Sequence, residues 1–453
     1  MLLSAVALAL AAATSVAPAE ASAPASGASA ASIAAPAFCA PLVFGEDPRT
    51  GEVTVDLALA ASLEPLQLLR DLDEVEPAEL RTLVDGHPEL VRQFLEAAPS
   101  PSDVTSWWDA LSRTEQGELT RAAPSLVGNL DGVPYEVRDA ANRSTLDRAL
   151  TELRADLRGS AGRGAATELA TRVGMLEKIE ASLDETPGGP DRTLLLLDTA
   201  MPGRAAVVLG ELETADYVSL LVPGALLSIR EHMTEWTKVT ADLYTAQNEW
   251  LEMFGEDATV ATVSWIGYQT PDVTNVVGLD LAEEGATFLS GTVNGLRDLR
   301  GDDEPHISVF AHSYGATAAM LALSRDDMRL DALAMMGSPG GSADSVDDLA
   351  VPAGSVWVGE AAWDPVVQTA FFGVDPGSEQ FGARTMSVSG AVDPLTGVAL
   401  SASVGHDWYL EPGTESLRNL SLIGIDRGDW VTEGVAADVG KTLALAPDTS
   451  SVR

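Results

Sequence analysis

Short apolar runs rich in β-forming residues alternate with longer helical patterns in the part of the chain that follows Pro190. This alternation is typical of a mostly parallel sheet whose faces are covered by helices. The first two runs are close enough to form a hairpin, so the sheet is expected to start antiparallel. The predicted strands are Thr193–Leu197, Ala205–Leu209, Tyr217–Val222, Thr259–Trp265, Ile307–Ala311, Ala332–Met336, Ser355–Val358 and Thr385–Ser389. The predicted crossover helices are Leu227–Phe254, Leu279–Leu299 and Ala316–Leu323.

The preceding part of the chain has a helical pattern. From Leu57 to about Leu183, apolar residues recur at helical spacing, and Pro and Gly divide the pattern into short helices. The segment 128–143 is rich in turn formers, and its Arg138 and Arg143 are placed to pair with nearby carboxylates. A helical hairpin packed on the larger domain is expected, and a lid over a pocket is the alternative. The predicted organisation is a signal-like segment and linker at 1–41, a helical region at 42–190, an α/β domain at 191–430 and a tail at 431–453.

The first residues resemble the apolar part of a secretory signal. Met1–Ala19 carries no charge and is followed by small-residue cleavage sites, although no Lys or Arg precedes Arg49 to supply a basic start. We therefore expect a secreted or otherwise extracytoplasmic protein. The alternative is a cytoplasmic protein with a disordered Ala/Ser/Pro-rich tail. A stable membrane anchor is not expected, because alanine contributes little to insertion and Pro18 ends the run.

The segment 306–323, HISVFAHSYGATAAMLAL, joins a β run to a helix of small residues at Ser313. A serine hydroxyl is a poor nucleophile unless a tight turn presents it to a base. Ala311 and Gly315, two residues before and after, are small enough for such a strained turn to pack closely. A second match centred on Ser403 follows no convincing strand and opens no helix. Ser313 is therefore the candidate nucleophile.

The candidate base and acid follow from the order serine, acid, histidine that accompanies this turn. Among the five histidines only His406 follows Ser313, and it lies in a loop after the last predicted strand. Asp364, in the loop after Ser355–Val358, is the candidate acid that would hold the imidazole in its working tautomer. His312, inside the turn, is expected to pack or to orient the turn. The alternative acids are Glu360, Asp375 and Asp393.

A developing oxyanion requires two convergent backbone donors. The N–H of Tyr314, directly after the candidate nucleophile, is the first. The second is expected from the loop after the third strand, residues 222–226, where Gly224 lets the backbone turn. Ala225 N–H is the predicted second donor, and Leu226 N–H is the alternative one residue later.

Composition limits the partners. The 453 residues include 68 acidic and 27 basic side chains, a net charge of −41. This charge opposes contact with phosphate backbones, so no nucleic-acid partner is expected, and it favours neutral or cationic substrates over anionic ones. No HExxH, paired CxxC or Walker A sequence occurs, so neither a metal nor a cofactor is expected. The expected partner is a small acyl substrate, and the sequence leaves the oligomeric state open.

Taken together, these motifs resemble the actinobacterial α/β-hydrolase family long catalogued as a domain of unknown function. The motifs are Val222-Pro223-Gly224, Ser264-Trp265-Ile266-Gly267-Tyr268 with Pro271, Ala311-His312-Ser313-Tyr314-Gly315, Asp364-Pro365, and His406-Asp407-Trp408-Tyr409-Leu410. The resemblance spans roughly Pro101 to Leu422 and includes Trp107-Trp108 and Gln116 in the helical region. It implies an eight-stranded, mostly parallel α/β-hydrolase sheet with flanking helices, and a serine hydrolase with the same three residues. Ala311 departs from the usual glycine.

The predicted activity is hydrolysis of a carboxylic ester through an acyl-enzyme, with Ser313 as nucleophile, His406 as base and Asp364 orienting it. Cleavage of an amide or peptide bond by the same residues is the first alternative, because only the leaving group and the pocket distinguish the two reactions. A non-catalytic binding protein with a hydrolase fold is the second alternative.

Overall fold

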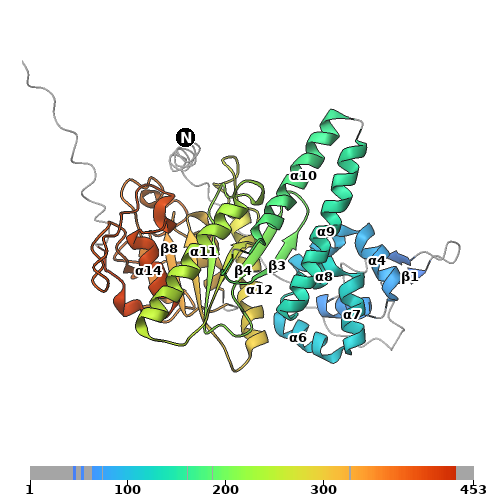
Figure 1. The fold of residues 1–453 in the computed structure, drawn as a ribbon, viewed down its shortest axis with the longest axis horizontal. Coiled ribbons are helices and arrows are strands. Elements are labelled where there is room, and N and C mark those ends of the chain that lie inside the picture. Colours follow the sequence, from blue (N-terminus) through green and yellow to red (C-terminus); the bar gives the residue numbers. More distant parts are fainter. Residues whose placement is uncertain are drawn as a thin grey trace, which may run out of the picture.

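The computed structural model describes residues 44–46, 53–55 and 64–434, except residues 74, 161, 186, 326 and 327. The predicted signal-like segment and residues 435–453 of the predicted tail lie outside the described residues. Figure 1 shows a helical part, coloured blue to blue-green, beside an α/β part coloured green to red.

An eight-stranded sheet forms the centre of the α/β part, in the order β10-β9-β8-β7-β5-β6-β4-β3. Strands β5 to β10 pair in parallel, whereas β4 pairs antiparallel with both β3 and β6. The strands are β3 Arg192–Asp198, β4 Arg204–Leu209, β5 Tyr217–Val222, β6 Val260–Ile266, β7 His306–His312, β8 Ala332–Met336, β9 Val356–Gly359 and β10 Arg384–Thr385. The predicted sheet with its antiparallel start is confirmed.

The eighth strand is shorter than predicted. It was expected to reach Ser389, but it ends at Thr385. After Met386, whose N–H still bonds to the Val358 carbonyl, the Ser387 N–H donates instead to the Thr432 carbonyl. After Met386 the backbone therefore no longer pairs with β9, and it pairs instead with the segment that contains Thr432.

Helices cover both faces of the sheet, so its parallel strands are buried almost throughout, as expected for such strands. Helices α12 and α13 share one core with the sheet, and α10, α11 and α14 share the other. In Figure 1, α11 crosses the near side of the sheet. These helices are α10 Arg163–Ser182, α11 Ile229–Phe254, α12 Asp280–Arg300, α13 Tyr314–Leu323 and α14 Glu415–Gly424. The three predicted crossover helices are confirmed.

The helical region has a core of its own that includes the buried Trp107 and Trp108. Most of its helices begin at a proline. The N–H of a first helical residue has no acceptor within the helix, so the helix loses no hydrogen bond when proline stands there. They are α3 Pro65–Asp73, α4 Pro77–Gly86, α5 Pro88–Glu96, α6 Pro101–Ala110, α7 Arg113–Ala122, α8 Pro124–Val127 and α9 Tyr135–Gly159. A short hairpin of β1 Phe44–Glu46 and β2 Val53–Val55 precedes them and was not predicted.

Side chains of the helical region cover the open edge of strand β3. Asn129 donates to the Leu197 carbonyl at 3.0 Å and accepts from its N–H at 2.8 Å. Asn142 donates to the Leu194 carbonyl at 3.0 Å, and Asp139 accepts from the Leu194 N–H. An edge strand with unpaired backbone groups is open to unwanted pairing, so these contacts both protect the sheet and attach the helical region to it.

The two predicted arginine pairs are confirmed. Arg138 pairs with Asp131 at 2.8 Å, and Arg143 pairs with Asp139 at 2.8 Å. A Cβ at Gly295 of α12 would lie 3.0 Å from the Asp131 Cβ, so the small residue lets this turn approach α12 closely. The turn-rich segment 128–143 therefore packs the helical region against the α/β part.

Helices α9 and α10 form the predicted hairpin, and its apolar side chains, such as Leu146, Leu150 and Ile179, belong to the same core as strands β3 and β4. The sheet thus uses residues that precede Pro190, and the domain boundary placed there stays a prediction. Among the described residues, no helix is long and apolar enough to cross a membrane.

Candidate active site

Ser313 occupies the turn between β7 and α13 with φ 54° and ψ −126°. This backbone conformation is strained for a residue with a side chain, and such strain concentrates at functional sites. The turn packs against the loop after β5: a Cβ at Gly224 would lie 2.5 Å from the Ser313 Cβ, and one at Gly315 would lie 2.5 Å from the Pro223 carbonyl oxygen. Because neither Gly224 nor Gly315 has a side chain, the two segments can approach each other this closely.

Ala311 departs from the glycine usual at this position. It is fully buried within β7 and pairs with Val222 of β5 and Met335 of β8. Its methyl group is absorbed by the apolar core, so the departure leaves the turn at Ser313 intact.

The three candidate side chains lie in one hydrogen-bonded line. His406 Nε2 lies 2.8 Å from Ser313 Oγ, and His406 Nδ1 lies 3.0 Å from both carboxylate oxygens of Asp364. An ionised carboxylate can only accept, so the proton of the neutral imidazole belongs on Nδ1, and Nε2 is left to accept from the serine hydroxyl. All three residues are buried. The structure thus brings together the predicted nucleophile, base and acid.

Asp364 is held by more than the histidine. The Val366 N–H donates to its Oδ1 at 2.9 Å, and the Tyr409 hydroxyl donates to its Oδ2 at 2.7 Å. Burial raises the pKa of the Asp364 carboxyl, but the hydrogen bonds and charge of His406, with the bonds from Tyr409 and Val366, outweigh it and keep that pKa below its usual value. The carboxylate therefore stays ionised beside the imidazole.

His312 supports the His406 loop. Its Nε2 donates to the His406 carbonyl oxygen at 2.7 Å, and the two rings lie 4.6 Å apart. Burial, together with the neighbouring His406, lowers the pKa of His312 to about 3. A neutral ring here adds no positive charge next to the candidate base. His312 was expected to pack or to orient the turn; it does pack, and its side-chain hydrogen bond is to the loop that carries His406.

Gly337 has a role that the sequence analysis missed. This residue, with φ 59°, begins the glycine-rich loop that follows β8. A Cβ on it would lie 2.8 Å from Asp364 Oδ2 and 3.0 Å from His406 Cε1. Only a glycine leaves room for the acid and base to meet. Its position directly after the strand beside β7 was the available signal.

The predicted oxyanion donors belong to the two segments that meet at the serine turn, helix α13 and the loop after β5. Tyr314 is the first residue of α13, so its N–H has no acceptor within the helix. The Leu226 N–H donates to the Pro271 carbonyl at 2.9 Å, so the alternative donor is already engaged and that alternative is wrong. Ala225 N–H stays the predicted second donor. The buried Tyr268 steadies this loop through a 2.7 Å bond to the Pro223 carbonyl.

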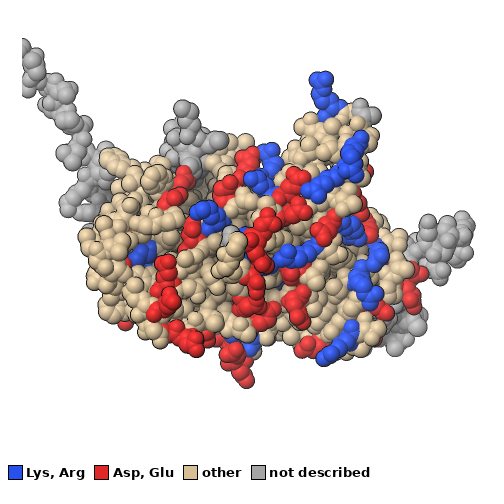
Figure 2. All heavy atoms as spheres, in the orientation of Figure 1, with Lys and Arg blue, Asp and Glu red and all other residues tan. Residues whose placement is uncertain are grey.

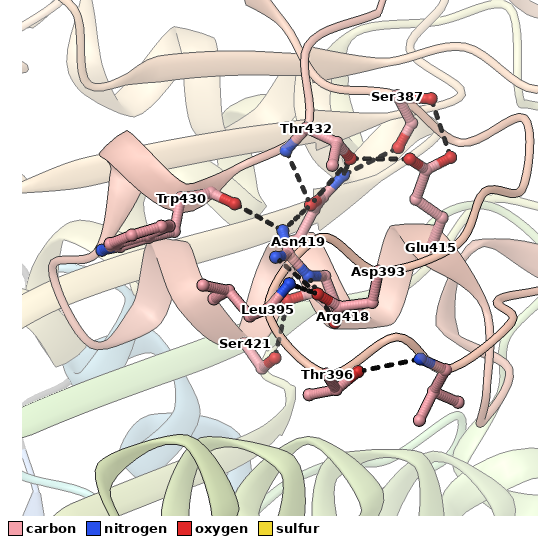
Figure 3. Close-up of polar contacts among 11 residues, drawn as sticks. Ser387, Asp393, Leu395, Thr396, Glu415, Arg418, Asn419, Ser421, Trp430 and Thr432 are labelled. Carbon is pink, nitrogen blue, oxygen red and sulfur yellow. Dashed lines mark hydrogen bonds and ion pairs between the residues drawn. The ribbon is translucent and has the colours of Figure 1, made fainter. Parts of the chain in front are cut away.

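The alternative acids do not reach the histidine. Asp393 is buried and pairs with Arg418 at 3.2 Å in a separate polar network (Figure 3). Asp375 accepts from the Gly377 N–H at 2.9 Å, which is a turn contact. Burial, with the charge and hydrogen bonding of Asp375, raises the pKa of Glu360 to about 8, so Glu360 is mainly neutral near pH 7.

Ser403, the second serine match, is buried in a bridged segment rather than on a strand-to-helix turn. Its N–H donates to the Val388 carbonyl at 2.8 Å, and the next residue, Val404, pairs with Ala362. Across the part of the chain that the structure describes, no three His, Cys, Asp or Glu side chains converge in a way that could hold a metal ion.

Part of this sheet, with the turn at Ser313, is similar to a known protein family. Residues 198–374 match the model of a family described as Alpha/beta hydrolase. The sheet, its flanking helices and this match together show the α/β-hydrolase fold. The matched segment covers less than half of the chain; it includes Ser313 and Asp364 and ends before His406.

Relatives of this chain occur in mycobacteria, in agreement with an actinobacterial family. The uncharacterized protein Rv2079 of Mycobacterium tuberculosis (strain ATCC 25618 / H37Rv) is 26% identical over 435 residues, which are 82% of this chain and 65% of that protein. The uncharacterized protein Mb0988c of Mycobacterium bovis is 29% identical over 227 residues, covering 49% of this chain and 83% of that protein. The chain thus spans less than two thirds of the length of the first relative.

Solved structures similar to the α/β-hydrolase chain include a dienelactone hydrolase from Anabaena variabilis, at 15% identity and a TM-score of 0.33, covering 54% of this chain and all of that one. An S-formylglutathione hydrolase from Agrobacterium tumefaciens is 11% identical with a TM-score of 0.32, covering 55% of this chain and 98% of that one.

Proposed function

We propose that this α/β-hydrolase chain is a serine hydrolase that cleaves a carboxylic ester through an acyl-enzyme. The observation that carries the proposal is the buried line from Ser313 Oγ through the His406 imidazole to the Asp364 carboxylate, with contacts of 2.8 and 3.0 Å. A serine on a strained turn, beside an imidazole whose tautomer is set by a carboxylate, has the arrangement needed for acyl transfer.

In the first half of the reaction, Ser313 Oγ attacks the ester carbonyl while His406 Nε2 takes the hydroxyl proton. The tetrahedral oxyanion accepts hydrogen bonds from the Tyr314 and Ala225 N–H groups. When the intermediate collapses, the bond to the leaving oxygen breaks, and His406 gives its proton to the departing alcohol. Asp364 stays ionised throughout and stabilises the imidazolium. In the second half, His406 Nε2 takes a proton from a water molecule whose oxygen attacks the acyl carbon. The bond from that carbon to Ser313 Oγ then breaks, and His406 returns the proton to Oγ as the acid leaves.

Covalent labelling tests the proposal. The purified protein is treated with a fluorophosphonate probe, and intact mass reports the adduct. One adduct is expected on the wild type and on Ser403→Ala, a buried serine outside the line, and none on Ser313→Ala. Hydrolysis of a dissolved p-nitrophenyl ester, with the matching p-nitroanilide as the amide arm, then separates esterase from amidase activity. A folded wild type that takes no label and hydrolyses neither compound would support the non-catalytic binding protein instead.

A further inference from the structure

Trp363 is placed unusually for a tryptophan. Its side chain is 88% exposed, and its φ of 65° lies in the left-handed region that bulky residues rarely adopt. It directly precedes Asp364, the candidate acid. A large apolar group held out in water on strained backbone gains nothing from the core, so packing against the part of the chain that the structure describes does not explain its position.

Further apolar side chains are exposed close to the base in the sequence. Trp408 is 56% exposed and Val404 is 48% exposed, and both lie two residues from His406. The two loops are joined, because the Gly405 N–H donates to the Ala362 carbonyl at 2.9 Å. Trp363 and Val404 therefore belong to one joined surface.

A second group of exposed apolar residues lies on the other flank of the serine. The segment before α12 exposes Val273, Val277 and Leu279, by 40%, 45% and 39%. This segment is attached to the serine turn, since the Tyr314 hydroxyl donates to the Gly278 carbonyl at 2.6 Å. We name Trp363, Val404, Trp408, Val273, Val277 and Leu279 the apolar rim. Both groups connect to Ser313, one through its contact with His406 and the other through Tyr314, which directly follows it.

The charge around the apolar rim selects its partner. In the segments 267–280, 360–366 and 403–411, every charged residue is acidic. At the left end of the molecule in Figure 2, where Figure 1 shows the loops after β10, few charged side chains are visible on that face. Negative charge repels an anionic surface, and the rim offers no Lys or Arg to attract one. The rim therefore suits an uncharged apolar surface.

We propose that the apolar rim binds a neutral lipid surface and thereby brings Ser313 to it. The substrate is then a water-insoluble neutral ester taken from that surface. The inference rests on the proposed function, because it places the ester at the same serine. Tryptophan suits such an interface, where its ring enters the apolar phase and its N–H stays hydrated. The apolar area removed from water on contact drives the association, and the substrate phase covers the rim.

Binding is tested first, without turnover, in the Ser313→Ala protein. Triolein droplets coated with phosphatidylcholine are floated with the protein, and the bound fraction is measured. The protein is expected to float with the droplets. Adding Trp363→Gly and Trp408→Ser should lower the partition coefficient at least fivefold. The glycine suits the positive φ, so this variant keeps its fold, as circular dichroism will check. The inference is overturned if both proteins bind the droplets equally. It is also overturned if the Ser313→Ala protein does not bind them, a result that would indicate that another part of the chain or a second copy covers the rim.

The matched control is Trp430→Ser. Trp430 is 47% exposed and contacts Phe254 at 6.5 Å between ring centres. Phe254 is the last residue of α11, which runs from the carboxyl end of β5 back to the amino end of β6. Trp430 therefore lies near the amino ends of the parallel strands, whereas Ser313 lies at their carboxyl ends. Its replacement should leave droplet binding unchanged. A loss as large as that of the rim variant would show that exposed tryptophan in general is responsible, and would overturn the inference.

Turnover separates this inference from the proposed function. The rate on tributyrin is measured below and above its solubility limit, beside the rate on dissolved p-nitrophenyl acetate. The wild type should show a step when droplets form, and the rim variant should have an emulsion-to-dissolved rate ratio at least fivefold lower. Activity on the dissolved ester with no step and no change in the ratio refutes the apolar rim alone. Absence of activity on every ester refutes the proposed function itself. Droplets containing 20% phosphatidylglycerol should bind less than neutral ones.

Discussion

The Tyr409 hydroxyl donates to Asp364 Oδ2 at 2.7 Å while it accepts from the Ala361 N–H at 2.8 Å. The carboxylate therefore receives hydrogen bonds from His406, from Tyr409 and from the Val366 N–H. Tyr409 is buried, so its hydroxyl has no water to replace these partners. We interpret it as a residue that positions the acid and lowers its pKa, without touching the substrate.

Tyr409→Phe should lower kcat on a dissolved ester about tenfold with little change in KM, because the acid loses a donor while the ester site is untouched. The free energy of unfolding should fall by about 1–3 kcal/mol, since the buried Ala361 N–H loses its acceptor. The pKa of Asp364 should rise, so the loss of kcat should grow as the pH is lowered. Steady-state kinetics over pH and urea denaturation measure these effects.

Tyr244→Phe on α11 is the control, and it should leave kcat unchanged. If Tyr409→Phe lost stability but kept the wild-type kcat and pH profile, Tyr409 would be a purely structural residue.

The serine turn and the base were predictable because they leave local signals. A β run, a serine between small residues and a helix specify the turn at Ser313, and chain order leaves a single histidine after it. The acid was harder to assign, since Asp364 competed with several loop carboxylates. Loop shape decides among these, and the structure shows that only Asp364 faces His406.

The supporting residues escaped prediction because their contacts join loops that are distant in the sequence. Tyr409 reaches Asp364 across 45 positions, and nothing in the residues around either one indicates the contact. The covering of strand β3 by Asn129 is a similar case, because it depends on how two segments that are distant in the sequence meet. The short β10 ends early for the same reason, since the segment after α14 competes for its backbone.

Gly337→Ala should slow fluorophosphonate labelling of Ser313 about 100-fold, because the added methyl would lie 2.8 Å from Asp364 Oδ2 and would push the acid from the base. The positive φ of Gly337 also costs stability when a side chain is added, roughly 1–2 kcal/mol. The labelling rate is followed by intact mass.

Gly354→Ala separates these two effects. Gly354 has φ 83°, and a Cβ on it meets nothing within 4 Å. It should lose similar stability and keep the wild-type labelling rate. Equal labelling rates in the two variants would contradict the packing role of Gly337.

Asn129→Ala should lower the free energy of unfolding by about 2–3 kcal/mol, because the N–H and carbonyl of Leu197 both lose their partner at the edge of the sheet. Urea denaturation gives this value. Asn248→Ala is the matched control, because the Asn248 side chain bonds only to the Tyr244 carbonyl within its own helix. A loss no greater than in this control would show that the helical region does not depend on the β3 edge.

Glu360 supplies the pH test. Burial, with the neighbouring Asp375, raises its pKa from 4.5 to about 8. Because the folded pKa exceeds the unfolded one, the stability associated with the neutral carboxyl is complete below about pH 4.5 and is lost as the pH rises through about 8. The wild type should therefore lose up to about 1.4 kcal/mol per pH unit in this window relative to Glu360→Gln, which does not titrate.

Urea denaturation at pH 6 and pH 8.5 measures this difference, and Glu360→Gln should gain on the wild type as the pH rises. Glu379→Gln, at an exposed carboxyl nearby, should follow the wild type at both values. Asp364 is present in all three proteins, so its opposite dependence, in which stability is lost as acid protonates the carboxylate, cancels from the comparison. Parallel pH dependence of Glu360→Gln and the wild type would mean that Glu360 is already ionised in the folded protein, and that the carboxyl pair beside the acid carries a charge that Asp364 must tolerate.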